Sequence, residues 1–197
     1  MELIKTKDLS KTYVSGETET KALNGISLII ENGEFSAITG PSGSGKTTLF
    51  NLIGALDSPT SGKITFAGDD LSKLNRKERT LFRREKIGFV FQTFNLIPVL
   101  TAFENVAFPL NLLGVSEKEI KEKVYNLLEK VGLKGMEERK PAALSGGQQQ
   151  RVAVARALIK GPVLVLADEP TANLDSATGG EIMKLMKKLN EEEEITF

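Results

Sequence analysis

The segment from Gly40 to Thr47 contains the residue types that most directly indicate chemistry. It reads GPSGSGKT and fits the spacing G-x-x-x-x-G-K-[ST] of a loop that wraps around phosphate groups. In such loops, backbone N–H groups and the following helix attract the anion, the lysine reaches the β/γ oxygens, and the hydroxyl binds Mg²⁺. A glycine-rich turn that only caps a helix is the simpler alternative. We expect a nucleotide to be bound by Gly40, Pro41, Ser42, Gly43, Ser44, Gly45, Lys46, Thr47 and Thr48.

Two adjacent carboxylates, Asp168 and Glu169, follow the apolar run VLVLA at 163–167. A carboxylate at the end of a buried strand requires a compensating cation, because burying an unpaired charge is costly. We expect Asp168 to hold Mg²⁺ on a triphosphate and Glu169 to polarise the attacking water. The alternative is an Asp-Glu pair at a strand end that caps the next helix.

A second sequence suited to binding an anion is LSGGQQQR, from Leu144 to Arg151. It places a serine and two glycines directly before a segment with helical periodicity, and a helix N-terminus attracts anions. One nucleotide does not need two such helix starts. On propensity alone, Ser145 is equally a simple N-cap.

Composition limits the possible functions further. The chain has 197 residues, is 40% hydrophobic and 26% charged, and balances 26 basic against 26 acidic residues, which disfavours nucleic-acid binding. It contains neither cysteine nor histidine, so zinc sites, thiol nucleophiles and histidine bases are excluded. The sequence has no apolar run of membrane-spanning length and no signal peptide, so we expect a cytoplasmic protein that reaches a membrane only through a partner.

Strands and helices alternate around these motifs. Strands are predicted at 2–14, 22–34 with a tight turn at Asn32-Gly33, 34–40, 62–68, 86–92 and 163–168. Helices are predicted at 46–56, 75–86, 101–114, 116–132, 146–159 and 176–194; the last has an apolar stripe of Ile182, Leu185, Met186 and Leu189. This order indicates an α/β fold: an antiparallel β-rich start, a mostly parallel core sheet and an inserted helical subdomain.

Taken together and in this order, the motifs resemble the ATP-binding subunit of ABC transporters. The resemblance rests on GPSGSGKTT, Gln92 after Phe91, LSGGQQQR and VLVLADEPTANLD, and covers essentially all 197 residues. Within the family, QTFNLIPVLTAFENVAFPL and ADEPTANLDSATG are most similar to the lipoprotein-release and macrolide-export subgroup. The resemblance implies a P-loop NTPase domain of the ABC ATPase type over 1–197, with a core at 1–92 and 161–197 and a helical subdomain at about 93–160.

The resemblance also implies roles for individual residues. ATP and Mg²⁺ would be bound with Tyr13 stacked on the adenine and Gln92 contacting the metal and the attacking water. The nucleotide of a second protomer would be bound in trans by Ser145, Gly146, Gly147 and Gln148, and Asp175 would cross the dimer interface. Two simpler alternatives stay open: Tyr13 as an aromatic packed on the core, and Asp175 as a residue of the cap before the next helix.

The implied partners are a second copy in an ATP-dependent head-to-tail homodimer and an integral membrane permease, with no nucleic acid. The permease would place the chain on the cytoplasmic face of the membrane and would dock near Phe94, Leu96, Ile97, Pro98 and Leu100. The family's switch histidine and its last strands and helix have no counterpart in the sequence. We therefore expect the C-terminal part of the domain to be missing, and hydrolysis to be slower than in a chain that carries the histidine.

Two other functions are compatible with the motifs. One is a soluble ABC-type ATPase that acts on nucleic acid, favoured only by a basic cluster that Glu78 and Glu85 interrupt: Arg76, Lys77, Arg79, Arg83, Arg84 and Lys86. A solvated helix face accounts for that cluster equally well. The other is a nucleotide-dependent regulator that does not hydrolyse ATP.

Overall fold

The computed structural model of the chain describes residues 1–16 and 18–197. Two compact units are present: Met1–Arg84 together with Thr196, and Glu85–Ile195 together with Phe197. Among the described residues, no helix is long and apolar enough to cross a membrane.

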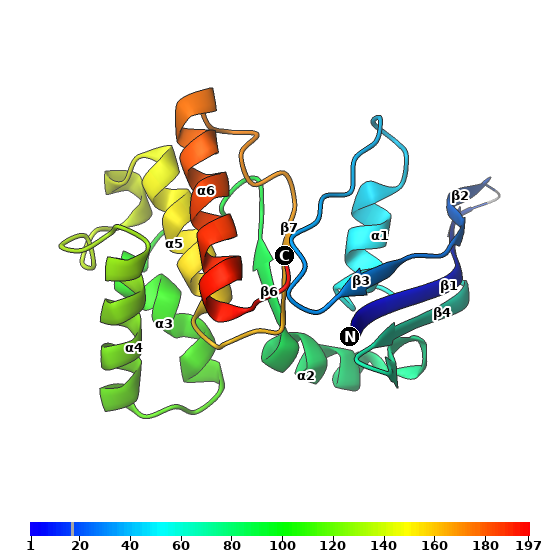
Figure 1. Cartoon of the computed structure of the whole chain (residues 1–197), viewed down its shortest axis with the longest axis horizontal. Coiled ribbons are helices and arrows are strands. Elements are labelled where there is room, and N and C mark those ends of the chain that lie inside the picture. Colours follow the sequence, from blue (N-terminus) through cyan, green and yellow to red (C-terminus); the bar gives the residue numbers. More distant parts are fainter. Residues whose placement is uncertain (17) are drawn as a thin grey trace. The chain divides into compact units, whose positions relative to one another are not determined.

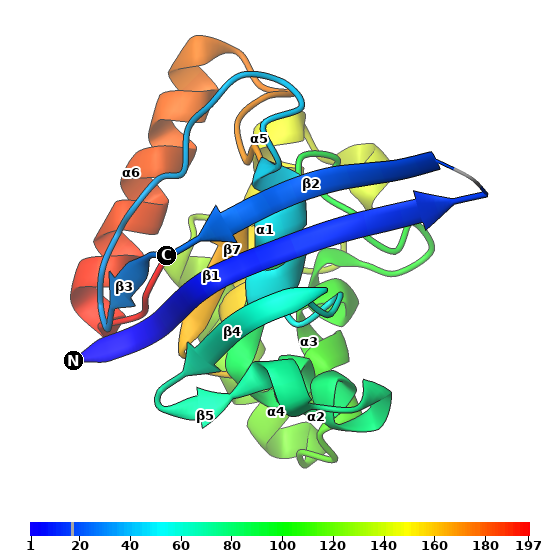
Figure 2. The same ribbon diagram turned by 90° about the vertical axis from the view of Figure 1, so that its right-hand side faces the viewer.

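The first unit is built on a mostly antiparallel sheet whose longest strand is β1 (Glu2–Ser15). Figure 2 shows β1 lying between β2 and β4. The remaining elements of the unit are β2 (Thr18–Ile26), β3 (Ile29–Glu31), α1 (Lys46–Ile53), β4 (Ser61–Phe66), β5 (Asp69–Asp70), the 3₁₀ helix η1 (Leu71–Lys73) and most of α2 (Arg76–Lys86). Leu3, Ile4, Leu9, Ile64 and Phe66 are buried, so the apolar side chains of β1 and β4 form much of its core.

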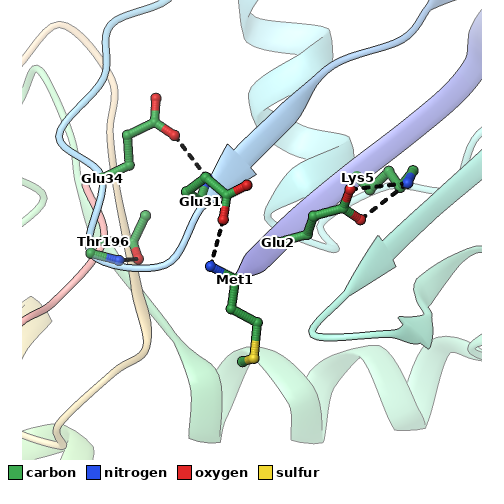
Figure 3. A network of polar contacts seen from close by, with 7 residues as sticks. Met1, Glu2, Lys5, Glu31, Glu34 and Thr196 are labelled. Atoms are coloured by element: carbon green, nitrogen blue, oxygen red, sulfur yellow. Dashed lines mark hydrogen bonds and ion pairs between the residues drawn. The ribbon is translucent and has the colours of Figure 1, made fainter.

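An ion pair and hydrogen bonds hold the end of the β1–β3 pair at which Met1 and Glu31 lie (Figure 3). The Met1 amino group lies 2.7 Å from a Glu31 carboxylate oxygen, and the Glu31 N–H donates to Glu34 Oε2 at 2.7 Å. The predicted turn at Asn32-Gly33 is present; Gly33 has φ 77°, and its N–H donates to Thr196 Oγ1 at 2.8 Å. A positive φ is inexpensive only for glycine, so the sequence sets this turn directly.

The strand predicted at 34–40 is wrong, because this segment has no regular secondary structure. A strand requires hydrogen bonds to a neighbouring strand, and none of the described strands pairs with these residues. Ile38 is exposed, so the segment also lacks a buried apolar face.

The helix predicted at 46–56 is shorter than expected. Helix α1 ends at Ile53, because Gly54 forms its C-cap and Ala55 has φ 52°.

The second unit joins a parallel strand pair to a group of helices (Figure 1). Strand β6 (Ile87–Val90) pairs with β7 (Leu164–Ala167), so residues far apart in the sequence meet at one strand edge. Helix α5 (Gly146–Leu158) is central, because it packs against α3, α4, α6 and β6. The other elements are α3 (Ala102–Leu112), α4 (Glu117–Lys130), the 3₁₀ helix η2 (Pro141–Ala143) and α6 (Ser176–Glu193).

Helical periodicity correctly identifies the buried side of α6. Ile182, Leu185, Met186 and Leu189 are all buried, as the apolar stripe predicts. In strand β6 of the same unit, a Cβ on Gly88 would lie only 2.5 Å from the Ala157 carbonyl oxygen. Helix α5 therefore packs directly against the backbone of β6, and any larger residue at Gly88 would force the two apart.

The segment between β6 and α3 is anchored by a buried side chain, Asn105 of α3. Its Oδ1 accepts from Ile97 N at 2.8 Å, and its Nδ2 donates to the carbonyl oxygens of Ile97, Leu100 and Thr101 at 2.9–3.2 Å. One amide thus satisfies several backbone groups of an irregular segment.

We predict that Asn105→Ala lowers the free energy of unfolding by about 2–3 kcal/mol, because it leaves buried backbone groups without partners. Urea denaturation measures this change. The control is Asn126→Ala, an exposed asparagine of α4, which should change stability by less than about 0.5 kcal/mol. Equal stabilities for the two variants would contradict the anchoring role of Asn105.

Candidate functional site

The glycine loop has the backbone conformation that phosphate binding requires. Gly45 is the N-cap of α1 with φ 91°, and Gly43 has φ 77°, a region that other residues rarely adopt. A Cβ on Gly45 would also lie 2.5 Å from the Ala22 carbonyl oxygen and 2.8 Å from Leu23 Cδ2. Both conformation and close packing therefore require glycine at position 45.

Lys46 follows this turn, and its ammonium is held by the loop itself. The Nζ donates to the carbonyl oxygens of Gly40 at 2.8 Å and Pro41 at 2.9 Å. Pro41 to Ser44 and Thr47 are exposed, and the first turn of α1 contains no acidic residue. The start of α1 thus combines a fixed positive charge, a helix N-terminus and an accessible hydroxyl, which together suit an anion with a bound cation.

Tyr13 of β1 is not a core residue, so that simpler interpretation of the sequence is wrong. Its side chain is 40% exposed, and its hydroxyl donates to Asp57 Oδ2 at 3.2 Å. Lys11 Nζ lies 5.0 Å from the centre of its ring and 2.8 Å from Asp57 Oδ2. Burial raises the pKa of Asp57, but hydrogen bonds from Lys11 and from Ser58 N–H outweigh it and lower the pKa below its ordinary value. Stacking on an adenine stays a prediction.

Asp168 and Glu169 leave the end of β7 in different environments. The Asp168 N–H donates to the Val90 carbonyl at 2.9 Å, which extends the β6–β7 pairing by one bond, and its side chain is half-buried. Glu169 is exposed and has φ 45°, a left-handed conformation that costs about 1–3 kcal/mol for a residue other than glycine. The abrupt backbone turn gives the two carboxylates separate positions, as two separate roles would require.

Gln92 lies two residues beyond Val90, the last residue of β6. Val90 pairs with Ala167, which directly precedes Asp168 and Glu169. The Gln92 side chain is exposed, and its carbonyl accepts a hydrogen bond from Asn173 Nδ2 at 3.0 Å. Asn173 therefore ties the Gln92 backbone to the segment that follows Glu169. Sequence reasoning missed Asn173, although its position between two predicted site residues, in ADEPTANLD, was a usable signal.

Ser145 caps α5 with reciprocal hydrogen bonds. Its Oγ accepts from Gln148 N at 3.3 Å, and its N–H donates to Gln148 Oε1 at 2.9 Å. Gly147 is buried, and a Cβ there would lie 2.5 Å from Thr178 Cγ2 of α6. The simple N-cap is thus present, and the glycine sequence also lets α5 approach α6 closely. Binding of a nucleotide in trans is an additional role that remains a prediction.

Asp175 caps α6 in the same way. Its Oδ1 accepts from Ala177 N and Thr178 N, both at 3.0 Å, and it is exposed. Hydrogen bonds from the Thr178 side chain and backbone, and from Ala177 N–H, lower the pKa of Asp175 below its ordinary value. Because Thr178 also contacts Gly147, the N-terminal ends of α5 and α6 are neighbours. The N-cap role of Asp175 is confirmed, and its role at a dimer interface stays a prediction.

The predicted site residues are divided between the two units. The first unit contains Tyr13 and the loop Gly40–Thr48. The second contains Gln92, Ser145, Gly146, Gly147, Gln148, Asp168, Glu169 and Asp175. Helix α2 carries the basic cluster, and Arg76, Lys77, Arg84 and Lys86 are exposed, in agreement with a solvated face. Arg79 and Arg83 are half-buried, and the Arg83 guanidinium donates to the Ala55 carbonyl oxygen at 2.6 Å.

The candidate metal ligands suit Mg²⁺. Thr47 offers a hydroxyl oxygen, Gln92 an amide oxygen and Asp168 a carboxylate oxygen, and Mg²⁺ prefers oxygen ligands. Among the described residues, no group of three or more His, Cys, Asp or Glu side chains could hold a metal ion. Thr47 belongs to the first unit and Gln92 and Asp168 belong to the second, so the binding of one ion by all three stays a prediction.

Known proteins resemble this chain over nearly its whole length. The sequence pattern described as "ABC transporter" matches residues 23–172. The macrolide export ATP-binding/permease protein MacB of Syntrophobacter fumaroxidans is 51% identical over 199 residues, which cover 100% of this chain and 28% of that protein. The lipoprotein-releasing system ATP-binding protein LolD of Legionella pneumophila is 50% identical over 188 residues, covering 95% of this chain and 83% of that protein.

A solved structure has the same fold. The cassette MJ0796 of Methanocaldococcus jannaschii, described as dimeric and in a post-hydrolysis state bound to ADP and Pi, superimposes with a TM-score of 0.88 at 49% identity. The match covers 98% of this chain and 85% of that one. The expected ABC ATPase fold, with its antiparallel β subdomain and helical part, is thereby confirmed.

Proposed function

The chain belongs to the ABC transporter family, and we propose that it is the ATP-binding and ATP-hydrolysing motor subunit of such a transporter. Proteins of this family bind nucleotide, and its relatives in the lipoprotein-release and macrolide-export subgroup are ATP-binding proteins. The observation that carries the proposal is the start of α1, where left-handed glycines precede a lysine that is held at the mouth of the loop.

Nucleotide binding would use this loop as follows. Lys46 would exchange its bonds to the neutral Gly40 and Pro41 carbonyls for bonds to phosphate oxygens, in which both donor and acceptor are charged. The N–H groups at the start of α1 would bind the remaining oxygens. Thr47, Gln92 and Asp168 would hold Mg²⁺, which when bound neutralises charge on the phosphates.

Hydrolysis would be carried out by Glu169 and Gln92. Glu169 is exposed and turned away from the strand by its positive φ, so its carboxylate can accept a proton from water. The Gln92 side chain would orient that water, and Asn173 would restrict its movement through the hydrogen bond to its carbonyl. The half-buried Asp168 would serve as a metal ligand.

Two anion-compatible helix starts in one chain support a composite site. The loop before α1 would bind the phosphates of one ATP without help from α5. The start of α5 could therefore bind the γ-phosphate of an ATP that a second copy of the chain holds. A two-fold, head-to-tail dimer supplies two such sites at once. The cassette MJ0796 is described as dimeric, which supports the same arrangement here.

A membrane permease is the proposed partner. The curated relative MacB is an ATP-binding/permease protein of which this chain spans 28%, so permease and ATPase functions occur together in that protein. We propose that here the permease docks on the segment after Gln92, where Pro98 and Val99 are exposed and Phe94, Leu96, Ile97 and Leu100 are half-buried. Docking would place the chain on the cytoplasmic face of the membrane.

We predict that Ser145→Arg raises the protein concentration needed for ATP-driven dimerisation by at least about tenfold, while the ATP Kd of the monomer stays nearly unchanged. The added side chain would occupy the position of the partner's γ-phosphate. Light scattering measures dimerisation, and calorimetry measures ATP binding.

The matched control is Ser116→Arg, which removes the N-cap of α4 and costs about 1 kcal/mol of stability in the same way. It should dimerise normally. Loss of ATP binding by the Ser145→Arg monomer would contradict the composite site, because α5 would then act on the nucleotide of its own chain.

A further inference from the structure

A half-buried side chain in the second half of α5, that of Arg156, holds the segment that follows Gln92. The Arg156 guanidinium donates to the carbonyl oxygens of Asn95 at 2.6 Å and Phe94 at 2.9 Å. Burial lowers the pKa of Arg156 below its ordinary value, in keeping with a guanidinium enclosed by the protein. Both contacts are to backbone atoms, so they restrain the path of the chain whatever the side chains at 94 and 95.

The restrained backbone is in an unfavourable conformation. Phe94 has φ 59° and Asn95 has φ 49°, so two consecutive residues other than glycine are left-handed. Each such residue costs about 1–3 kcal/mol and persists only when its surroundings hold it. Local bonds between Thr93 and Asn95 contribute, and Arg156 supplies the contacts from outside the loop. Without Arg156, the loop would relax toward ordinary conformations, and Gln92 would move with it.

A second side chain of α5 holds the other candidate catalytic segment. Gln150 is fully buried, and its Nε2 donates to the Pro170 carbonyl oxygen at 2.7 Å. Pro170 directly follows Glu169, whose φ is 45°. Among the described residues, Gln150 Oε1 has no hydrogen-bond partner, so burying this amide costs free energy. The bond that the amide does make, through Nε2, is to the strained turn.

We propose that Arg156 and Gln150 are positioning residues through which α5 fixes the Gln92 loop and the Glu169 turn in their strained, catalytically competent conformations. This inference rests on the proposed function, since it assigns a role relative to Gln92 and Glu169. It also links the start of α5, where the partner's ATP would bind, to both groups that act on water. In this proposal neither residue contacts ATP. Arg156 acts through the segment that contains Gln92, and Gln150 acts through the turn that contains Glu169.

The test compares Arg156→Met and Gln150→Met with matched variants outside the sequence LSGGQQQR. Arg83→Met is the control for Arg156, because the half-buried Arg83 also donates to a backbone carbonyl, that of Ala55, at 2.6 Å. Asn190→Leu is the control for Gln150, because the buried Asn190 also donates to a backbone carbonyl, that of Ile195, at 2.7 Å. We expect kcat for ATP hydrolysis to fall about tenfold or more in the two test variants and by less than about twofold in the controls, with ATP Kd unchanged in all.

Double-mutant cycles separate positioning from general destabilisation. In a Gln92→Ala background, Arg156→Met should have no further effect on kcat; in a Glu169→Gln background, the same holds for Gln150→Met. The proposal would be overturned if the reductions in kcat multiplied in the double variants, or if the control variants lost as much kcat as the test variants. If the wild-type chain hydrolyses no ATP, the proposed function fails; if it does and the test variants match it, only this inference fails.

A structural measurement covers the case in which a methionine variant folds poorly. Arg156→Lys keeps the charge and a donor, and should fold and give an intermediate kcat. Amide hydrogen exchange of the full chain should be faster at residues 92–97 in this variant than in the wild type, and unchanged there in Arg83→Lys. Unchanged exchange at 92–97 in Arg156→Lys, with wild-type kcat, would refute the role of Arg156.

Discussion

Replacing Glu169 with glutamine is expected to reduce kcat for ATP hydrolysis by about 10³-fold, within the range that general bases contribute. Glutamine keeps the size and hydrogen-bonding capacity of the side chain but cannot accept a proton from water. In the proposed mechanism the exposed Glu169, which has a φ of 45°, makes that transfer, and the half-buried Asp168 holds the metal. Single-turnover release of phosphate measures the rate of the chemical step.

The matched control is Glu194→Gln, since Glu194 is also exposed and left-handed, with φ 54°. It should hydrolyse ATP at the wild-type rate. Glu169→Gln should bind ATP normally and, because bound ATP persists, should accumulate as an ATP-bound dimer. A Glu169→Gln variant that turns over like the control would show that another group activates the water.

Replacing Lys46 with alanine is expected to weaken ATP binding by at least about 100-fold, that is by about 2.7 kcal/mol or more. The Lys46 ammonium is held directly on the loop through the Gly40 and Pro41 carbonyls, and alanine supplies no charge to attract a phosphate at that position. Calorimetric titration of ATP into the variant measures the change in Kd.

Lys63→Ala is a suitable control, because Lys63 is a surface lysine of the same unit that lies 3.6 Å from Asp70. Its ATP Kd should equal that of the wild type. A normal Kd for Lys46→Ala would contradict the assignment of Gly40–Thr47 as a phosphate-binding loop.

Local patterns in the sequence predict most of the elements. The apolar stripe of α6 and the Asn32-Gly33 turn depend on residues close in the chain, so periodicity and glycine identify them. The predicted strand at 34–40 fails because strand formation depends on a neighbour that the local sequence does not specify.

The same distinction applies to the candidate site. The glycine loop and the cap of α5 by Ser145 follow from short-range spacing, and both are present. Gln150, Asn173 and Arg156 were missed, because each acts on a backbone carbonyl that is between 20 and 81 residues away. A carbonyl is present at every position, so no sequence pattern reveals which one a side-chain amide or guanidinium will contact.

Mixing two inactive variants tests the composite site most directly. In a Glu169→Gln background, one chain carries Lys46→Ala and the other Ser145→Arg, and the two carry different tags. A head-to-tail dimer of these chains contains one site with both defects and one with an unaltered loop and an unaltered α5 start. We predict that the tags co-elute with Mg-ATP only in the mixture, whereas each variant alone stays monomeric. A mixture that stays monomeric would show that the loop and the α5 start do not complement one another across two chains.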